Sequence, residues 1–237
     1  MPYLFVLTIS KILSVLFATP TVCTRKAPSP TLFPSDNQPT NLLLYAILPA
    51  QVPESLSQLT NLLFLDLSRN SFDIAEIYWS DMSELRCLYM EEVRNDDGML
   101  LDHSICHLHK LRELSCMSTR LHDLPDQIGN LVSLNFLQLT HCDLDELPES
   151  ITRLTNLVEL HAIGASFSSL PENFGNLRAL EVIDFECNID YIAIPPSFLH
   201  LTRLRKLTMP NTLIKPPGYD AFVTTLQTAG CNYVQNS

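Results

Sequence analysis

Four residues in one short stretch carry side chains that commonly bind metal ions: His103, Cys106, His107 and His109. His103 and His107 are four residues apart, a spacing that can place two imidazoles on one helix face. No carboxylate stands at a spacing that would complete a site. The stretch is therefore interpreted as part of a turn, and neither a metal nor any other cofactor is predicted.

Nucleophilic catalysis has equally little support. The seven cysteines are scattered without a C-x-x-C pair, and each falls where the repeat described below explains it. Glycine-rich phosphate loops are absent, since no Gly is followed by Lys. The chain is predicted not to be an enzyme. The enzymatic alternative would need bound metal, or a hydrolase activity lost on substitution of His103 or His107.

Composition narrows the class of partner. Hydrophobic residues make up 46% of the 237 residues, enough for a substantial core. A formal net charge of −11 disfavours nucleic acid, because phosphate recognition needs clustered Lys and Arg. The predicted partner is a protein with a basic or amphipathic surface.

One frame recurs along the chain: P-x-x-Φ-x-x-L-x-x-L-x-x-L-x-L-x-x-N/C-x-L, where Φ is apolar. Equivalent leucines stand at 62, 85, 111, 134, 157, 180 and 204, in steps of 23, 26, 23, 23, 23 and 24 residues. The longest step contains the polar segment 94–100, which is predicted to bulge from the surface. About seven such copies predict a solenoid in which each repeat packs on its neighbours.

The spacing within a copy predicts its local structure. In L-x-L, Leu65 and Leu67 should point inward and Asp66 outward from a short strand. The P-x-x-Φ-x-x-L segment has the three-residue spacing of a helical or 3-10 turn. We therefore expect a parallel sheet on one side, short turns on the other, and a leucine core between them that includes Ile214 of the last copy.

The Asn or Cys after each strand should turn inward and bond free backbone groups. Only Asn70 and Asn188 supply an amide at this position. The corresponding turns of the other copies are expected to be less regular.

Copies such as LPESITRLTNLVELHAIGASFSS, residues 147–169, resemble the leucine-rich repeat family. The LPxxIxxLxxLxxLxLxxC/N wording is similar to the subgroup of intracellular Ras-binding-type proteins and plant disease-resistance receptors. The resemblance spans about residues 53–217. It implies an α/β leucine-rich repeat solenoid, a curved horseshoe with parallel strands on the concave face and short helical or 3-10 turns on the convex face.

The rest of the chain divides by composition. Residues 1–23 form an apolar segment, interrupted by Lys11, that resembles a signal peptide or anchor; a degenerate repeat or a packed helix is the alternative. Residues 24–40, rich in Pro, Ser and Thr, predict a linker. The solenoid occupies 41–217, with 41–48 as the candidate N-terminal cap. Residues 218–237 predict a capping helix and tail, with Asp220 as N-cap and Gly230 as terminator.

Repeat folds bind partners through their curved sheet, so the outward residues of the predicted strands, here called the strand face, are the candidate site. Apolar side chains alternate there with acids, as in binding patches. The residues predicted to contact the partner are Phe64, Asp66, Tyr89, Glu91, Glu113, Met117, Phe136, Gln138, Glu159, His161, Ile163, Asp184 and Glu186.

The predicted function is a non-catalytic protein-interaction module in intracellular signalling or defence recognition. Scattered cysteines and the lack of an N-x-[ST] acceptor favour a cytoplasmic location. The apolar residues 1–23 keep a secreted or membrane-anchored recognition protein open as the alternative.

Overall fold

The computed structural model describes residues 41–44, 56, 59–71, 77–93, 101–188, 192–211 and 213–236. The apolar segment 1–23, the linker 24–40 and the insertion 94–100 therefore lie outside the described residues, as does the second half of the candidate cap, 45–48.

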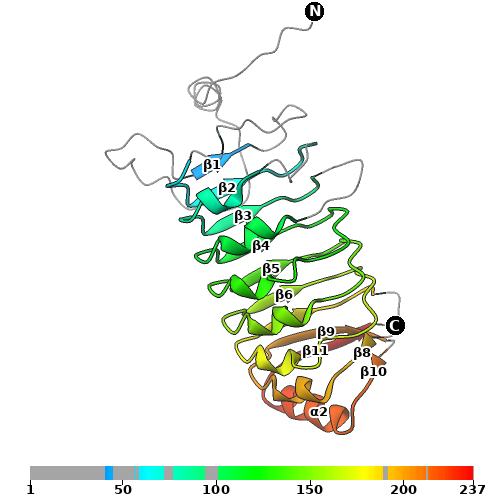
Figure 1. Ribbon diagram of the computed structural model, residues 1–237. Coiled ribbons are helices and arrows are strands. Elements are labelled where there is room, and N and C mark those ends of the chain that lie inside the picture. The colour runs from blue at the N-terminus through cyan, green and yellow to red at the C-terminus, as the bar shows by residue number, and fades with distance from the viewer. Residues whose placement is uncertain are drawn as a thin grey trace, which may run out of the picture.

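A single row of parallel strands runs the length of the described solenoid (Figure 1). Neighbouring repeats pair in strict register, with Leu65 opposite Leu88 and Leu88 opposite Leu114. The strands, in their order across the sheet, are β1 (Asn41–Leu43), β2 (Phe64–Asp66), β3 (Cys87–Tyr89), β4 (Glu113–Ser115), β5 (Phe136–Gln138), β6 (Glu159–His161), β7 (Val182–Asp184), β9 (Lys206–Pro210) and β11 (Asn232–Asn236).

Short 3-10 helices line the side opposite the sheet (Figure 1). Each closes with a three-residue hydrogen bond, as from the Leu131 amide to the Ile128 carbonyl at 3.1 Å, which matches the three-residue spacing of the apolar positions. They are η3 (Trp79–Asp81), η4 (His103–His107), η5 (Ile128–Asn130), η6 (Glu149–Arg153), η7 (Phe174–Asn176) and η8 (Pro196–His200). The predicted arrangement of a parallel sheet and opposing 3-10 turns is confirmed.

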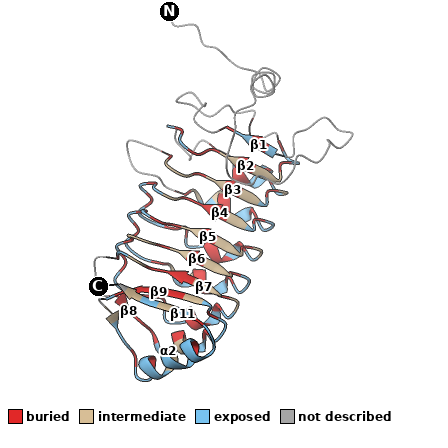
Figure 2. Cartoon of the chain, turned by 180° about the vertical axis from the view of Figure 1, so that it is seen from behind, coloured by how far each residue is buried: buried red, intermediate tan, exposed pale blue. Residues whose placement is uncertain are grey.

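The frame leucines fill one continuous core between the two sides. Buried residues recur in repeat after repeat along the chain (Figure 2). Leu65 and Leu67 are fully buried, as predicted, and so are Cys116 and Cys142. Each such leucine contributes about 1.5–3 kcal/mol by leaving water. The prediction for Ile214 is wrong: it is 58% exposed, because β10 (Leu213–Ile214) pairs with β8 (Ile192–Ala193) and turns its last side chain outward.

The corner that follows each of the strands β2 to β7 has the same backbone conformation. One residue takes a positive φ at the equivalent frame position each time, whether or not an amide follows it; these residues are Arg69, Glu92, Ser118, His141, Gly164 and Cys187. The expectation of less regular turns is therefore wrong for the copies that carry Val93, Thr119, Cys142 or Ala165 in place of Asn. The ladder of amide-to-carbonyl bonds continues through these corners and imposes one shape on all of them, as from Ser118 to Thr140 at 2.8 Å. In the last copy, Asn211 at the equivalent position has no positive φ, and Thr212 lies outside the described residues.

The side chain that follows the corner bonds backbone carbonyls, as predicted. Asn70 Nδ2 donates to the carbonyls of Leu44 at 2.8 Å and Leu67 at 2.7 Å, which links two repeats. Where Asn is replaced, smaller groups take over part of this role: the Thr119 hydroxyl donates to the Cys116 carbonyl at 2.6 Å and Cys142 Sγ to the same oxygen at 3.0 Å.

Helix α2 (Tyr219–Thr228) covers the C-terminal end of the core with Tyr219, Val223 and Leu226. Its N-cap is Gly218, with φ +86°, and not Asp220, which lies in the first turn. At the other end Gly230, with φ +91°, donates to the Gln227 carbonyl and closes the helix as predicted. Strand β11 then adds to the sheet beside β9, an element that the sequence pattern did not predict.

Candidate functional site

The register places the outward side chains of the strand face in rows that cross the sheet. One row passes from Glu113 through Phe136 to Glu159 on adjacent strands. A parallel row passes from Ser115 through Gln138 to His161. Since adjacent strands lie about 4.8 Å apart, each side chain is framed by neighbours from the adjacent repeats, 23 to 26 residues away in sequence.

A groove of about 530 Å³ opens on the strand face over β3 to β6. Its size is within the range of sites that accept side chains or small ligands. Six of the predicted residues line it together: Tyr89, Glu91, Glu113, Phe136, Gln138 and Glu159. The groove thus combines two aromatic rings with three carboxylates.

Two further lining residues, Asn135 and Val158, were not predicted. Asn135 lies between the inward Leu134 and the outward Phe136. A signal for them exists in the frame, because L-x-x-L leaves two successive residues between inward leucines, and strict strand alternation accounts for only one of them.

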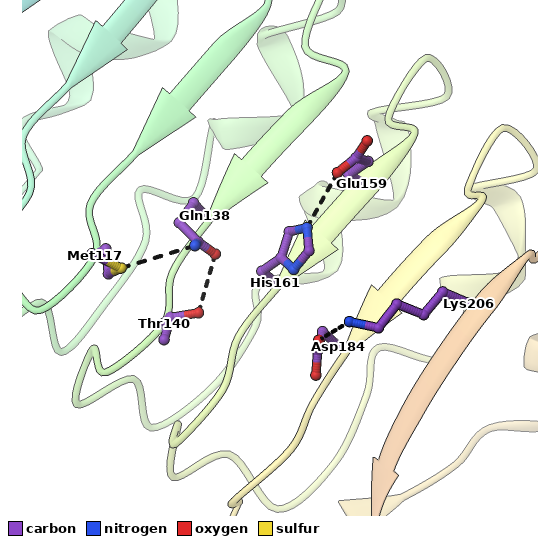
Figure 3. Close-up of polar contacts among 7 residues, drawn as sticks. All are labelled: Met117, Gln138, Thr140, Glu159, His161, Asp184 and Lys206. Carbon is purple, nitrogen blue, oxygen red and sulfur yellow. Dashed lines mark hydrogen bonds and ion pairs between the residues drawn. The ribbon is translucent and has the colours of Figure 1, made fainter. Parts of the chain in front are cut away.

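The remaining predicted residues flank the groove. The Phe64 ring contacts that of Tyr89, with 5.3 Å between centroids, and the His161 ring lies 5.6 Å from that of Phe136. Met117 Sδ is 4.0 Å from Gln138 Nε2 (Figure 3). Ile163 and Glu186, two residues beyond β6 and β7, are half-buried. Asp66 on β2 accepts a hydrogen bond from the Ser68 amide at 2.9 Å.

Hydrogen bonds between side chains hold the acids of the groove in place. The Tyr89 hydroxyl donates to the Glu113 carboxylate on the next strand. The Ser115 hydroxyl donates to Glu91 at 2.8 Å, and His161 Nε2 lies 3.3 Å from the Glu159 carboxylate (Figure 3). Because these partners come from the scaffold, the groove presents carboxylates whose positions are set before any partner binds.

Asp184 differs from the other predicted acids. Only 5% of it is exposed, so the expectation that it faces solvent is wrong. Lys206 on β9 covers it, with Nζ 2.6 Å from Oδ2, whereas Oδ1 is buried without a hydrogen-bond partner (Figure 3). The small outward residues are covered by their neighbours in the same way: Ser68, Ser115, Thr140 and Thr208.

The charges of the strand face are unequal. Within the described strands β2 to β7 and β9 and the residue pairs that follow them, Lys206 is the sole outward lysine or arginine, and it pairs with Asp184. The outward carboxylates are Asp66, Glu91, Glu113, Glu159, Asp184 and Glu186. The face therefore attracts positively charged groups.

The histidine stretch forms a turn on the opposite side. His103 and His107 bound η4, and in a 3-10 helix residues three apart, not four, share a face. His107 Nδ1 lies 3.2 Å from the Ser104 carbonyl, and His109 Nδ1 lies 3.1 Å from that of Asn130. Among the described residues, no group of three His, Cys, Asp or Glu side chains is placed to hold a metal ion.

Burial makes the thiols of Cys87 and Cys106 poor nucleophiles. Burial raises the pKa of Cys87 to about 11, and burial also raises the pKa of Cys106 to about 11. Cys87, the first residue of β3, is half-buried. Both side chains are therefore protonated near neutral pH.

The sequence profile described as "Leucine-rich repeat region" matches residues 68–228, more than half of the 237 residues. The chain belongs to the leucine-rich repeat family. The sequence resemblance and the fold thus agree. No curated protein sequence matches this leucine-rich repeat chain significantly.

Solved leucine-rich repeat structures match most of the chain. The Arabidopsis receptor kinase HAESA, in complex with the peptide hormone IDA and the co-receptor SERK1, matches with a TM-score of 0.68 and 25% identity over 86% of this chain and 34% of HAESA. The Leptospira interrogans protein LIC12759 matches with a TM-score of 0.66 and 23% identity over 78% of this chain and 45% of that one. This leucine-rich repeat chain thus spans less than half the length of both.

Internalin C2 from Listeria monocytogenes also shares the fold, with a TM-score of 0.63 and 17% identity over 83% of this chain and 80% of that one. Receptor kinases and internalins together do not single out the intracellular subgroup that the repeat wording resembles. Within the described leucine-rich repeats and cap, no helix is long and apolar enough to cross a membrane.

Proposed function

We propose that this chain is a non-catalytic interaction module that binds a basic or amphipathic protein or peptide on its strand face. The observation that carries the proposal is the groove over β3 to β6, where the rings of Tyr89 and Phe136 lie beside Glu91, Glu113 and Glu159. Aromatic side chains framed by polar groups supply much of the energy of protein interfaces.

The preformed groove favours recognition with little reorganisation. Its walls are strands that are hydrogen-bonded to a strand on either side. Its carboxylates are held in position by Tyr89, Ser115 and His161. The conformational entropy lost on binding is then mainly that of the partner, which is the advantage of a preorganised surface. HAESA, a fold neighbour, is a receptor in complex with a peptide hormone. That supports a peptide or an extended protein segment as the partner here.

The test is selection of random twelve-residue peptides against the full chain, followed by titration of the recovered peptides. The double substitution Glu113→Lys/Glu159→Lys should abolish their binding, since it reverses the charge of the groove. The matched control is Asp126→Lys/Glu172→Lys, which makes the same change of charge at exposed positions beside η5 and η7 on the opposite side. Asp184 is omitted because a buried lysine would disturb the fold.

Binding that weakens with added salt and survives only in the control variant supports the proposal. Peptides that bind both variants equally, with unchanged salt dependence, would show that the strand face is not the site. Circular dichroism and thermal unfolding of each variant establish that the chain remains folded.

The cellular role that fits this module is recognition in intracellular signalling or defence, in the cytoplasm. The alternative, a secreted or membrane-anchored recognition protein, is favoured by the apolar residues 1–23 and by the likeness to receptor kinases. Expression of the full chain with a C-terminal fluorescent protein separates the two. Cytoplasmic signal without cleavage supports the first, and cleavage after Cys23 with secretion supports the second.

A further inference from the structure

Within the groove, an aromatic ring lies between two glutamates, an arrangement more specific than a general acidic surface. Phe136 on β5 stands directly between Glu113 on β4 and Glu159 on β6 in one row across the sheet. The three strands are successive, so the α-carbons of the two glutamates are about 10 Å apart, with the aromatic ring between them.

The two glutamates are held from outside the row. The Tyr89 hydroxyl donates to Glu113 from β3, and His161 Nε2 lies 3.3 Å from Glu159 Oε2. Each carboxylate uses one oxygen in these contacts and has a second oxygen to accept from a ligand. The Phe136 ring is only half-buried, so part of it remains in contact with the groove.

None of the residues that line the groove is basic: Tyr89, Glu91, Glu113, Asn135, Phe136, Gln138, Val158 and Glu159. A cationic occupant would therefore meet no competing lysine or arginine among these lining residues. The outward lysine of the face, Lys206 on β9, lies three strands beyond Phe136 along the sheet and is already bonded to Asp184 at 2.6 Å.

We propose that this row is a binding site for an arginine side chain of the partner, with the guanidinium on the Phe136 ring and its N–H groups directed to Glu113 and Glu159. The inference rests on the proposed function and specifies the residue that the groove selects. A guanidinium is flat, stacks on aromatic rings and has five donors in its plane, which can reach carboxylates on both sides.

Lysine fits this arrangement less well. Its ammonium is a compact, strongly hydrated charge that bonds one carboxylate at a time and does not stack. Asn135 and Gln138, from the same repeat as Phe136, add amide groups that can bond the backbone of the segment carrying the arginine.

The peptides selected against the full chain test this directly. Those whose binding is lost in Glu113→Lys/Glu159→Lys should be enriched in arginine. In such a peptide, Arg→Lys should weaken binding about tenfold and Arg→citrulline about a hundredfold, because citrulline keeps the shape and loses the charge. Glu113→Gln and Glu159→Gln should each weaken the arginine peptide about tenfold and leave the citrulline peptide unchanged.

Phe136→Leu should weaken the arginine peptide about three- to tenfold by removing the stacking surface. Phe222→Leu, which makes the same change at a half-buried ring of α2 away from the strand face, is the matched control. This inference is overturned if the peptides that need Glu113 and Glu159 lack arginine, or if their arginine and lysine forms bind equally well. Either result leaves the proposed function standing. If every recovered peptide binds the Glu113→Lys/Glu159→Lys variant as well as the parent chain, the proposed function itself is wrong.

Discussion

The Tyr89 hydroxyl on β3 donates a hydrogen bond to the Glu113 carboxylate on β4, and so one repeat orients an acid of the next. Tyr89→Phe removes this bond and keeps the ring that packs 5.3 Å from Phe64. We expect the free energy of unfolding to fall by about 1 kcal/mol. We expect the affinity for arginine peptides to fall about threefold, because Glu113 is less well oriented. Urea unfolding and peptide titration measure the two effects, and no change in either would mean that the bond does not position Glu113.

Gly175 lies in η7, where the 3-10 turns of neighbouring repeats touch. A Cβ at this position would stand 1.8 Å from the Ser197 carbonyl oxygen of the next turn, which is backbone and cannot rotate away. Gly175→Ala should therefore lower the free energy of unfolding by about 2 kcal/mol or more. Asn176→Ala, at an exposed position in the same turn, should change it by less than about 0.5 kcal/mol. Equal stability of the two variants in urea unfolding would contradict this packing.

Ser118 is an exposed residue at the left-handed corner, with φ +57°. This conformation costs non-glycine residues about 1–2 kcal/mol, partly offset by the greater unfolded-state freedom of glycine. Ser118→Gly should therefore stabilise the protein by up to about 1 kcal/mol. The converse change, Gly164→Ala at φ +68°, should destabilise it by at least as much, since the added Cβ would stand 2.9 Å from His141 Nδ1. Thermal unfolding compares the pair, and shifts in the same direction would contradict the assignment.

The buried thiols predict loss of stability at alkaline pH. Burial raises the pKa of Cys116 well above the ordinary value of 9.0, and burial likewise raises the pKa of Cys142. Above about pH 9 the unfolded chain loses these protons and the folded protein keeps them. The free energy of unfolding should then fall as pH rises, by up to about 1.4 kcal/mol per pH unit for each thiol.

Urea unfolding at pH 7.5, 9 and 10 with a reductant present measures this slope. Cys116→Ala isolates one thiol: its curve should be less steep between pH 9 and 10 than that of the parent chain. Identical slopes would show that the Cys116 pKa is not raised in the folded protein.

The repeat period in the sequence predicted most of the fold. Alternation in L-x-L placed Leu65 and Leu67 in the core, and the spacing of Ile128 and Leu131 predicted a 3-10 turn. The corner conformation could not be read from single residues, because backbone bonds to the next repeat impose it on His141 and Gly164 alike. Strand β11 was missed because residues 232–236 lack the frame, and their pairing with β9 becomes possible only after α2 reverses the chain.

The repeat period also predicted part of the candidate site. Strand alternation identified Phe136 and Glu159 as outward residues, and the register then made them neighbours. Alternation within one strand does not show whether a side chain of the adjacent strand covers an outward residue. It therefore did not predict that Lys206 would bury Asp184. It also missed Asn135, whose place in the groove depends on how the chain enters β5.

The corner shared by all these repeats has a consequence for how such a protein can change. Because its shape depends on the adjoining ladder and not on the residue present, loss of a whole 23-residue unit by unequal recombination would leave equivalent corners facing each other in register. Removing residues 124–146 would bring Glu113 next to Glu159 and delete Phe136 in a single event. New binding preferences could thus arise by shuffling intact units, a larger step than any point substitution provides.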